Sequence, residues 1–206
     1  MTIRLLPLCA ALALASVAIP AAAQSAGDWT VAIGVHQVDP KSDNGALANN
    51  TLNVDVGSDL KPTVTAEYFI ADNLGIELLA SWPFEHDISI DGLGQVGSTK
   101  HLPPTLSLQY HFGQGAITPF VGAGVNFTRF SGEETSGALA GSRLDLENSW
   151  GLAAHAGVDF KVGERGAIRV DARWIDIDTD VSLDGADLGR VQIDPLVYGV
   201  AYVIKF

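Results

Sequence analysis

Eight segments of the sequence alternate between large apolar side chains and small or polar ones, and this pattern constrains the fold more than any other feature. They are residues 29–38, 61–70, 74–83, 103–112, 118–130, 148–160, 166–178 and 193–206. A period of two is that of a β-strand, whose successive side chains point to opposite faces. Each segment has about ten residues or more, the length that a tilted strand needs to cross a bilayer. No helical period competes, so the sequence predicts an all-β chain.

The connections between these segments alternate in length. The long ones, about residues 39–60, 84–102, 131–147 and 179–192, are polar, glycine-rich and acidic. The short ones, around residues 71–73, 113–117 and 161–165, carry turn residues such as Asp-Asn and Gly-Gln-Gly. An even strand number with long loops on one side is typical of outer-membrane barrels. We therefore predict an eight-stranded antiparallel transmembrane β-barrel of up-and-down topology; soluble lipocalin-type barrels lack this asymmetry and keep their apolar face inside.

The period assigns the two faces of each predicted strand. In the last segment Leu196, Tyr198 and Val200 share one side, and Val197, Gly199 and Ala201 share the other. The large apolar residues outnumber what an eight-stranded lumen can hold, so we expect them to face lipid. Aromatic residues at the strand ends of this face should form two interfacial girdles. They are Trp29, Tyr68, Trp82, Tyr110, Phe112, Trp150, Phe160, Trp174, Tyr198 and Phe206.

The N-terminal 23 residues differ from the rest and predict export. Arg4 precedes an unbroken apolar run, and Ala21-Ala22-Ala23 fits a signal-peptidase site. The run is too short for a membrane anchor and lacks a stop-transfer flank. We predict a signal peptide at residues 1–23 and a barrel at residues 24–206. Removal of the signal peptide would take away one basic residue and leave 11 basic and 24 acidic residues. The resulting net charge of −13 disfavours nucleic acid as a partner.

The inward face of the predicted barrel carries charges. Unpaired charges in a narrow lumen are costly, so we expect an ion-pair and hydrogen-bond network there. Its predicted members are Glu67, Glu77, Arg169, Asp171, Arg173 and Lys205, with Gln109, His111, His155 and Asp159 nearby. The favoured interpretation is a structural plug at the periplasmic end, and the alternative is a selectivity or gating network.

Several segments together resemble one known family. KHLPPTLSLQYHF (Lys100–Phe112), PFVGAGVNFTRF (Pro119–Phe130), SWGLAAHAGVDF (Ser149–Phe160) and the terminal Phe206 resemble the OmpW family of small outer-membrane porin-like β-barrel proteins. The resemblance spans essentially all of residues 24–206. It implies a Gram-negative outer-membrane location and a narrow, largely apolar channel that admits small hydrophobic molecules and releases them sideways through the wall. The implied partners are outer-membrane lipids and lipopolysaccharide, small hydrophobic solutes and, through Phe206, the barrel assembly machinery.

A few residues are candidates for such a path. Leu79, Ile175 and Val197 are apolar inward positions at the loop ends of their strands and would line the outer mouth. Pro103 and Pro104 would lie at the rim, where proline can interrupt a hydrogen-bond ladder and open a lateral exit. Ordinary barrel packing is the alternative for each of them.

The other motifs give weaker indications of function. Asp176, Asp178 and Asp180 have the spacing of a calcium loop, but Val181 replaces its glycine, so a solvated rim is favoured over a loose cation site with Asp184 and Asp187. No cofactor, metal or catalytic set is indicated, and we predict no enzymatic activity.

Two functions stay open: passive uptake of hydrophobic solutes, or a structural or interaction protein whose closed barrel displays acidic loops. The histidines, which show no zinc-like spacing, are His36, His86, His101, His111 and His155.

Overall fold

The computed structural model describes residues 24–206, so the predicted signal peptide lies outside the described residues. Within them, eight strands close into an antiparallel barrel in the order β10-β11-β14-β1-β3-β4-β7-β8, and β8 pairs with β10. The fold prediction is confirmed. The barrel strands are β1 (Trp29–Asp39), β3 (Asp59–Ala71), β4 (Leu74–Ser81), β7 (Thr105–His111), β8 (Ile117–Thr135), β10 (Ser149–Val162), β11 (Gly166–Ile175) and β14 (Leu196–Lys205).

The predicted faces of the strands are also confirmed. Val200 is 48% exposed and pairs with Val35 and Val170, which are outward as well, whereas Val197, Ala201 and Val203 are buried. All ten predicted girdle aromatics are exposed on the outer surface, by 38% for Tyr68 up to 74% for Trp150. Large side chains face outward because the lumen of eight strands has room for few of them.

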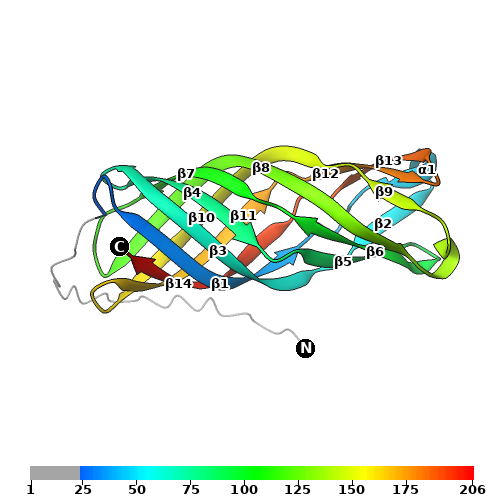
Figure 1. Ribbon diagram of the computed structural model, residues 1–206. Coiled ribbons are helices and arrows are strands. Elements are labelled where there is room, and N and C mark those ends of the chain that lie inside the picture. The colour runs from blue at the N-terminus through cyan, green and yellow to red at the C-terminus, as the bar shows by residue number, and fades with distance from the viewer. Residues whose placement is uncertain (1–23) are drawn as a thin grey trace, which may run out of the picture.

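The long connections are not the polar loops that composition suggested. They form further strands that extend the barrel at the end opposite the C-terminus (Figure 1). Within each, a short alternation directs valines and isoleucines inward and acids outward: Val54 and Val56 are buried, while Asn53 and Asp55 are not. The additional elements are α1 (Leu47–Asn50), β2 (Leu52–Val56), β5 (Phe84–Ile90), β6 (Gly94–Leu102), η1 (Gly137–Leu139), β9 (Leu144–Leu146), β12 (Asp178–Leu183) and β13 (Ala186–Gln192).

The extension is continuous with the barrel wall along part of its circumference. β6 pairs with the long outer half of β8, β5 pairs with β6, and β2 pairs with β5. β12, β13 and β9 form a separate three-stranded sheet, and residues of both sheets line one cavity. Among residues 24–206, no helix has both the length and the hydropathy to span a membrane.

The lipid-facing assignment predicts the effect of a charge at mid-strand. Val200→Arg should destabilise the folded barrel by about 2–4 kcal/mol, because it places a cation near the centre of the hydrocarbon layer. Leu196→Arg, on the same face of β14 but at its outer end, should cost only about 0–1 kcal/mol. Urea unfolding in phosphatidylcholine vesicles measures both. Equal costs for the two variants would contradict the assignment.

Candidate functional site

Two arginines organise a buried charge network inside the barrel. Arg169 donates to Asp159 through Nε (2.8 Å) and Nη2 (3.0 Å), and to Glu77 Oε2 through Nη1 (2.9 Å). Arg173 donates to Glu77 Oε1 through Nη1 (2.7 Å) and to Asp171 through Nε (2.8 Å). All five side chains are buried, and they come from β4, β10 and β11. Glu77 thus bridges two guanidinium groups from across the lumen.

Histidines and amides extend this network around the wall. His111 Nε2 donates to Glu67 Oε1 (2.9 Å). Gln109 Nε2 donates to the other carboxylate oxygen, Glu67 Oε2 (3.0 Å). His36 lies between Thr63 Oγ1 (2.6 Å) and Asp171 Oδ1 (3.0 Å). His155 Nε2 lies 2.8 Å from Gln109 Oε1. With these contacts the network includes side chains of six strands, and most of its carboxylate oxygens have a hydrogen-bond donor.

Aromatic rings fill the space beside the network. The Phe120 ring lies 4.4 Å from the guanidinium carbon of Arg169, and Phe69 packs on His111 with ring centroids 5.2 Å apart. Gly122 leaves room for His155, because a Cβ at that position would lie 2.3 Å from the imidazole Nε2. The lumen at this level is therefore occupied by packed, mutually paired side chains.

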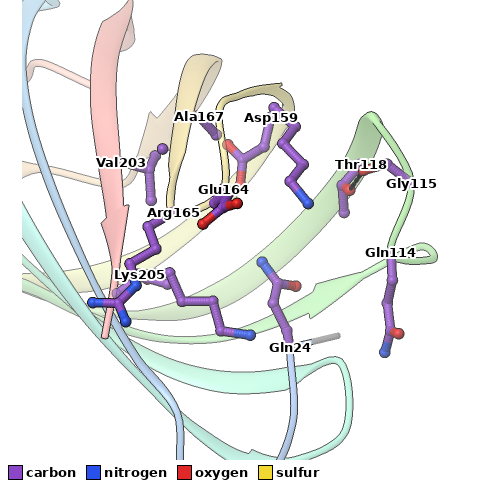
Figure 2. Close-up of a pocket in the computed structure, with 13 residues that line it drawn as sticks. Gln24, Gln114, Gly115, Thr118, Asp159, Glu164, Arg165, Ala167, Val203 and Lys205 are labelled. Carbon is purple, nitrogen blue, oxygen red and sulfur yellow. Dashed lines mark hydrogen bonds between the residues drawn. The ribbon is translucent and has the colours of Figure 1, made fainter. Parts of the chain in front are cut away.

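The structure brings together all but one of the six residues predicted for the lumen network. Lys205 lies instead at the periplasmic mouth, where its Nζ is 2.7 Å from Asp28 Oδ2 and its side chain is 22% exposed. That hydrogen bond lowers the pKa of Asp28. Figure 2 shows the end of the Lys205 side chain near Gln24, with Arg165 on the other side of Lys205. These residues line a cavity of about 80 Å³. Lys205 is the last residue of β14, so its position follows from the strand end rather than from the inward face alone.

An apolar chamber occupies the opposite end of the molecule, inside the extension. Its volume is about 150 Å³, and its exposed lining is apolar. All four long connections contribute to the wall, for example through Leu47, Ile90, Leu144 and Val181. The sequence did not predict this chamber. The signal was present in short alternations such as Asn53-Val54-Asp55-Val56, but acids and glycines dominate the composition of those segments.

The three predicted mouth residues lie between the network and the chamber. Leu79, Ile175 and Val197 are buried, with exposures of 5%, 1% and 4%. Leu79 and Ile175 follow Glu77 and Arg173 by two positions on the same strand faces, one step nearer the chamber. Ile175 and Val197 belong to the same apolar cluster as the chamber wall. The charge network therefore borders these three apolar side chains, here called the apolar layer, although Thr105 opposite Leu79 is buried and polar.

The wall is interrupted beside this layer. β4 pairs with β7 only as far as Leu79–Thr105, and the pairing of β5 with β6 begins at Phe84–His101. Pro103 and Pro104 lie in that interruption, and Asn126 Nδ2 holds their carbonyl oxygens at 3.1 and 3.2 Å. Proline has no backbone N–H, so neither residue donates a ladder hydrogen bond here, although the Pro104 carbonyl oxygen accepts one from Phe127 of β8 (3.0 Å). Both prolines thus lie between β6 and β7, where the extension joins the barrel, and their role in a lateral exit stays a prediction.

The acidic residues of the rim are arranged differently from a calcium loop. Asp180 pairs with Arg190 (2.8 Å), and Asp184 and Asp187 accept hydrogen bonds from the backbone N–H groups of Arg143 and Gly189. Asp176 and Asp178 instead meet Asp194, with one oxygen of each within 4.8 Å of the others. Burial and the two neighbouring carboxylates raise the pKa of Asp178. Lys41, 2.9 Å from Asp194, balances part of this charge.

Comparison with known proteins identifies the fold family. The sequence profile of the OmpW family matches residues 25–206. The chain belongs to the OmpW family. It is 37% identical over 200 residues to outer membrane protein W of Vibrio cholerae, covering 91% of this chain and 92% of that protein. It is 31% identical over 197 residues to outer membrane protein AlkL of Ectopseudomonas oleovorans, covering 86% and 82%.

A solved structure of the same kind agrees with this assignment. The crystal structure of the outer membrane protein OprG from Pseudomonas aeruginosa is 33% identical, with a TM-score of 0.78 over 88% of this chain and 97% of that one. As an OmpW-family barrel, the protein is located in the outer membrane. The girdle aromatics then mark the two membrane interfaces, and the chamber lies on the side of the long connections.

The charge network predicts an asymmetry between buried and exposed ion pairs. Glu77→Ala should lower the free energy of unfolding by about 3–5 kcal/mol, because it leaves two buried guanidinium groups without their shared partner. The matched control is Asp180→Ala, which removes the exposed partner of Arg190 and should leave the unfolding midpoint nearly unchanged. Urea unfolding in vesicles measures both variants. A midpoint for Glu77→Ala equal to that of the control would contradict a stabilising network.

Proposed function

We propose that this outer-membrane barrel mediates the passive uptake of small hydrophobic molecules, which enter the apolar chamber from outside. The observation that carries the proposal is the position of the chamber directly beyond a lumen filled with ion pairs. Lipopolysaccharide presents a polar layer that apolar solutes cross slowly. A chamber that removes apolar surface from water stabilises such a solute by about 25 cal/mol per Å².

The charge network makes straight passage through the lumen unfavourable for an apolar solute. To pass, it would have to separate Arg169 and Arg173 from Glu77 and leave buried charges unpaired. The wall interruption at Pro103 and Pro104 offers another direction, because it adjoins Leu79 on the apolar layer. The proposed path therefore leads from the chamber past Leu79 and sideways into the membrane, which is the route that the family resemblance implied.

A second candidate function rests on the acidic outer surface of the extension. The same filled lumen suits a structural or interaction protein, whose closed barrel displays the acidic outer surface of the extension to partners. Asp43, Asp91 and Asp187, for example, lie on its outer elements. In that case the chamber would be only the core that holds the extension together.

Solute entry into proteoliposomes distinguishes the two functions. Liposomes carrying the refolded chain of residues 24–206 should take up radiolabelled naphthalene faster than empty liposomes. Leu79→Arg should abolish the acceleration, because it places a charge in the apolar layer beside the wall interruption. Rates are measured by rapid filtration after folding has been verified by circular dichroism.

The matched control is Leu60→Arg, the same substitution at an outward position near the outer end of β3, where Leu60 is 55% exposed. It should leave the rate unchanged. Entry into wild-type liposomes no faster than into empty ones would reject the uptake proposal and favour the interaction protein. Equal loss in both arginine variants would reject the path past Leu79.

A further inference from the structure

Four polar atoms without hydrogen-bond partners gather at one wall of the apolar chamber. They are His86 Nε2, Thr99 Oγ1, and both ring nitrogens of His101. The three residues line the chamber, and each is 1–2% exposed. His86 pairs with Thr99 in the β5–β6 ladder, and the two imidazole rings stack with centroids 4.6 Å apart. Folded proteins leave few buried polar atoms unpaired, so four of them in one place point to a missing partner.

The hydrogen-bonding roles of these atoms follow from their surroundings. Burial lowers the pKa of both histidines, so both rings are neutral at pH 7. His86 Nδ1 contacts the carbonyl oxygen of Gly57, which can only accept, so Nδ1 carries the hydrogen. His86 Nε2 is then a lone-pair acceptor that needs a donor. Neutral His101 offers one donor and one acceptor, and Thr99 offers a hydroxyl group.

We propose that the chamber is a binding site for neutral apolar molecules that carry a hydroxyl group, such as phenols and long-chain alcohols. The apolar body occupies the chamber, and the hydroxyl group donates to His86 Nε2 while accepting from His101 or Thr99. The inference rests on the proposed function, since it requires that apolar molecules enter the chamber. It adds the class of molecule that this site selects.

Other chemical classes fit these atoms less well. A hydrocarbon leaves all four atoms unpaired, and an ether or ketone only accepts, so His86 Nε2 stays without a donor. A carboxylate or an ammonium group would have to lose its hydration in a lining without a buried counter-charge. A site built to pair with a hydroxyl group discriminates against analogues that lack it, because its own polar groups are then left unpaired.

The head group reaches these atoms through a small rearrangement. In the structure all four atoms are buried beneath the apolar lining. We infer that a small tilt of the rings, in which His86 Nδ1 keeps its hydrogen bond to the Gly57 carbonyl oxygen, brings a nitrogen to the chamber surface. Occupation by a hydroxyl group should therefore change the magnetic environment of the ring nitrogens, whereas occupation by a hydrocarbon should change it little.

Three probes of one ring system test the proposal on the refolded barrel in lipid nanodiscs. They are 2-naphthol (donor and acceptor), 2-methoxynaphthalene (acceptor only) and naphthalene (neither). His86→Phe keeps an aromatic ring at the wall and removes the acceptor nitrogen. We expect this variant to bind 2-naphthol about tenfold more weakly than the wild type, equivalent to about 1.4 kcal/mol. Its affinities for naphthalene and 2-methoxynaphthalene should be unchanged. Equilibrium dialysis measures all three.

The matched control is Leu188→Ala, which enlarges the apolar part of the wall and should weaken all three probes alike. If His86→Phe does not fold, ¹⁵N NMR spectra of the wild-type histidine rings test the proposal instead. The chemical shift of His86 Nε2 should change on addition of 2-naphthol and not on addition of naphthalene. Equal losses for 2-naphthol and naphthalene in His86→Phe, or identical spectra with both, would overturn the hydroxyl assignment alone. Wild-type protein that binds none of the probes would instead reject the proposed function.

Discussion

Backbone hydrogen bonding in hydrocarbon is the constraint on which the rest of this structure depends. A lipid-exposed sheet cannot leave an edge of unpaired N–H and C=O groups, so the strands must close on themselves. Closure here is completed by the pairing of β8 with β10. With eight strands the resulting lumen is narrow, and large apolar side chains such as Leu108 and Leu152 are left on the outside.

The inward face then has to be filled by side chains that tolerate a small, polar, enclosed space. Arg169 and Arg173 supply bulk and charge, and Glu77, Asp159 and Asp171 neutralise them at hydrogen-bond distance. The network leaves little of the lumen suited to an apolar molecule. An apolar site can form only where strands continue beyond the membrane, and β8, which runs to Thr135, carries part of the wall that far. The filled lumen and the apolar chamber are thus two consequences of the same closure.

Much of this arrangement could be predicted from the sequence. Alternation over ten residues located every barrel strand, because lipid outside and a polar lumen inside impose opposite demands on successive residues. It also placed Glu67, Glu77, Asp171 and the two arginines on one inner surface, and Leu79, Ile175 and Val197 at its outer limit. The boundaries were less accurate: residues 131–135 were assigned to a loop but continue β8.

The extension could not be predicted because its alternating runs are short. Val54 and Val56, or Ile88 and Ile90, are too few to stand out among the acids and glycines around them, and their inward direction depends on pairing between distant connections. The sequence suggests no role for His86 and His101 other than metal binding, for which their spacing is unsuitable. Their proximity arises from the pairing of β5 with β6, with Phe84 opposite His101. The meeting of Asp194 with Asp176 and Asp178 likewise depends on tertiary structure and has no signal in local spacing.

The central claim is that an apolar solute occupies the chamber and does not cross the charge network. Crystals of the protein soaked in 1-bromonaphthalene test this directly, because anomalous scattering locates the bromine. The account predicts a bromine peak within the chamber, beside Ile90 and Val181, or at the wall interruption near Pro103. A peak in the lumen below Arg169, on the periplasmic side of the network, would show that the solute passes through it and would contradict the account.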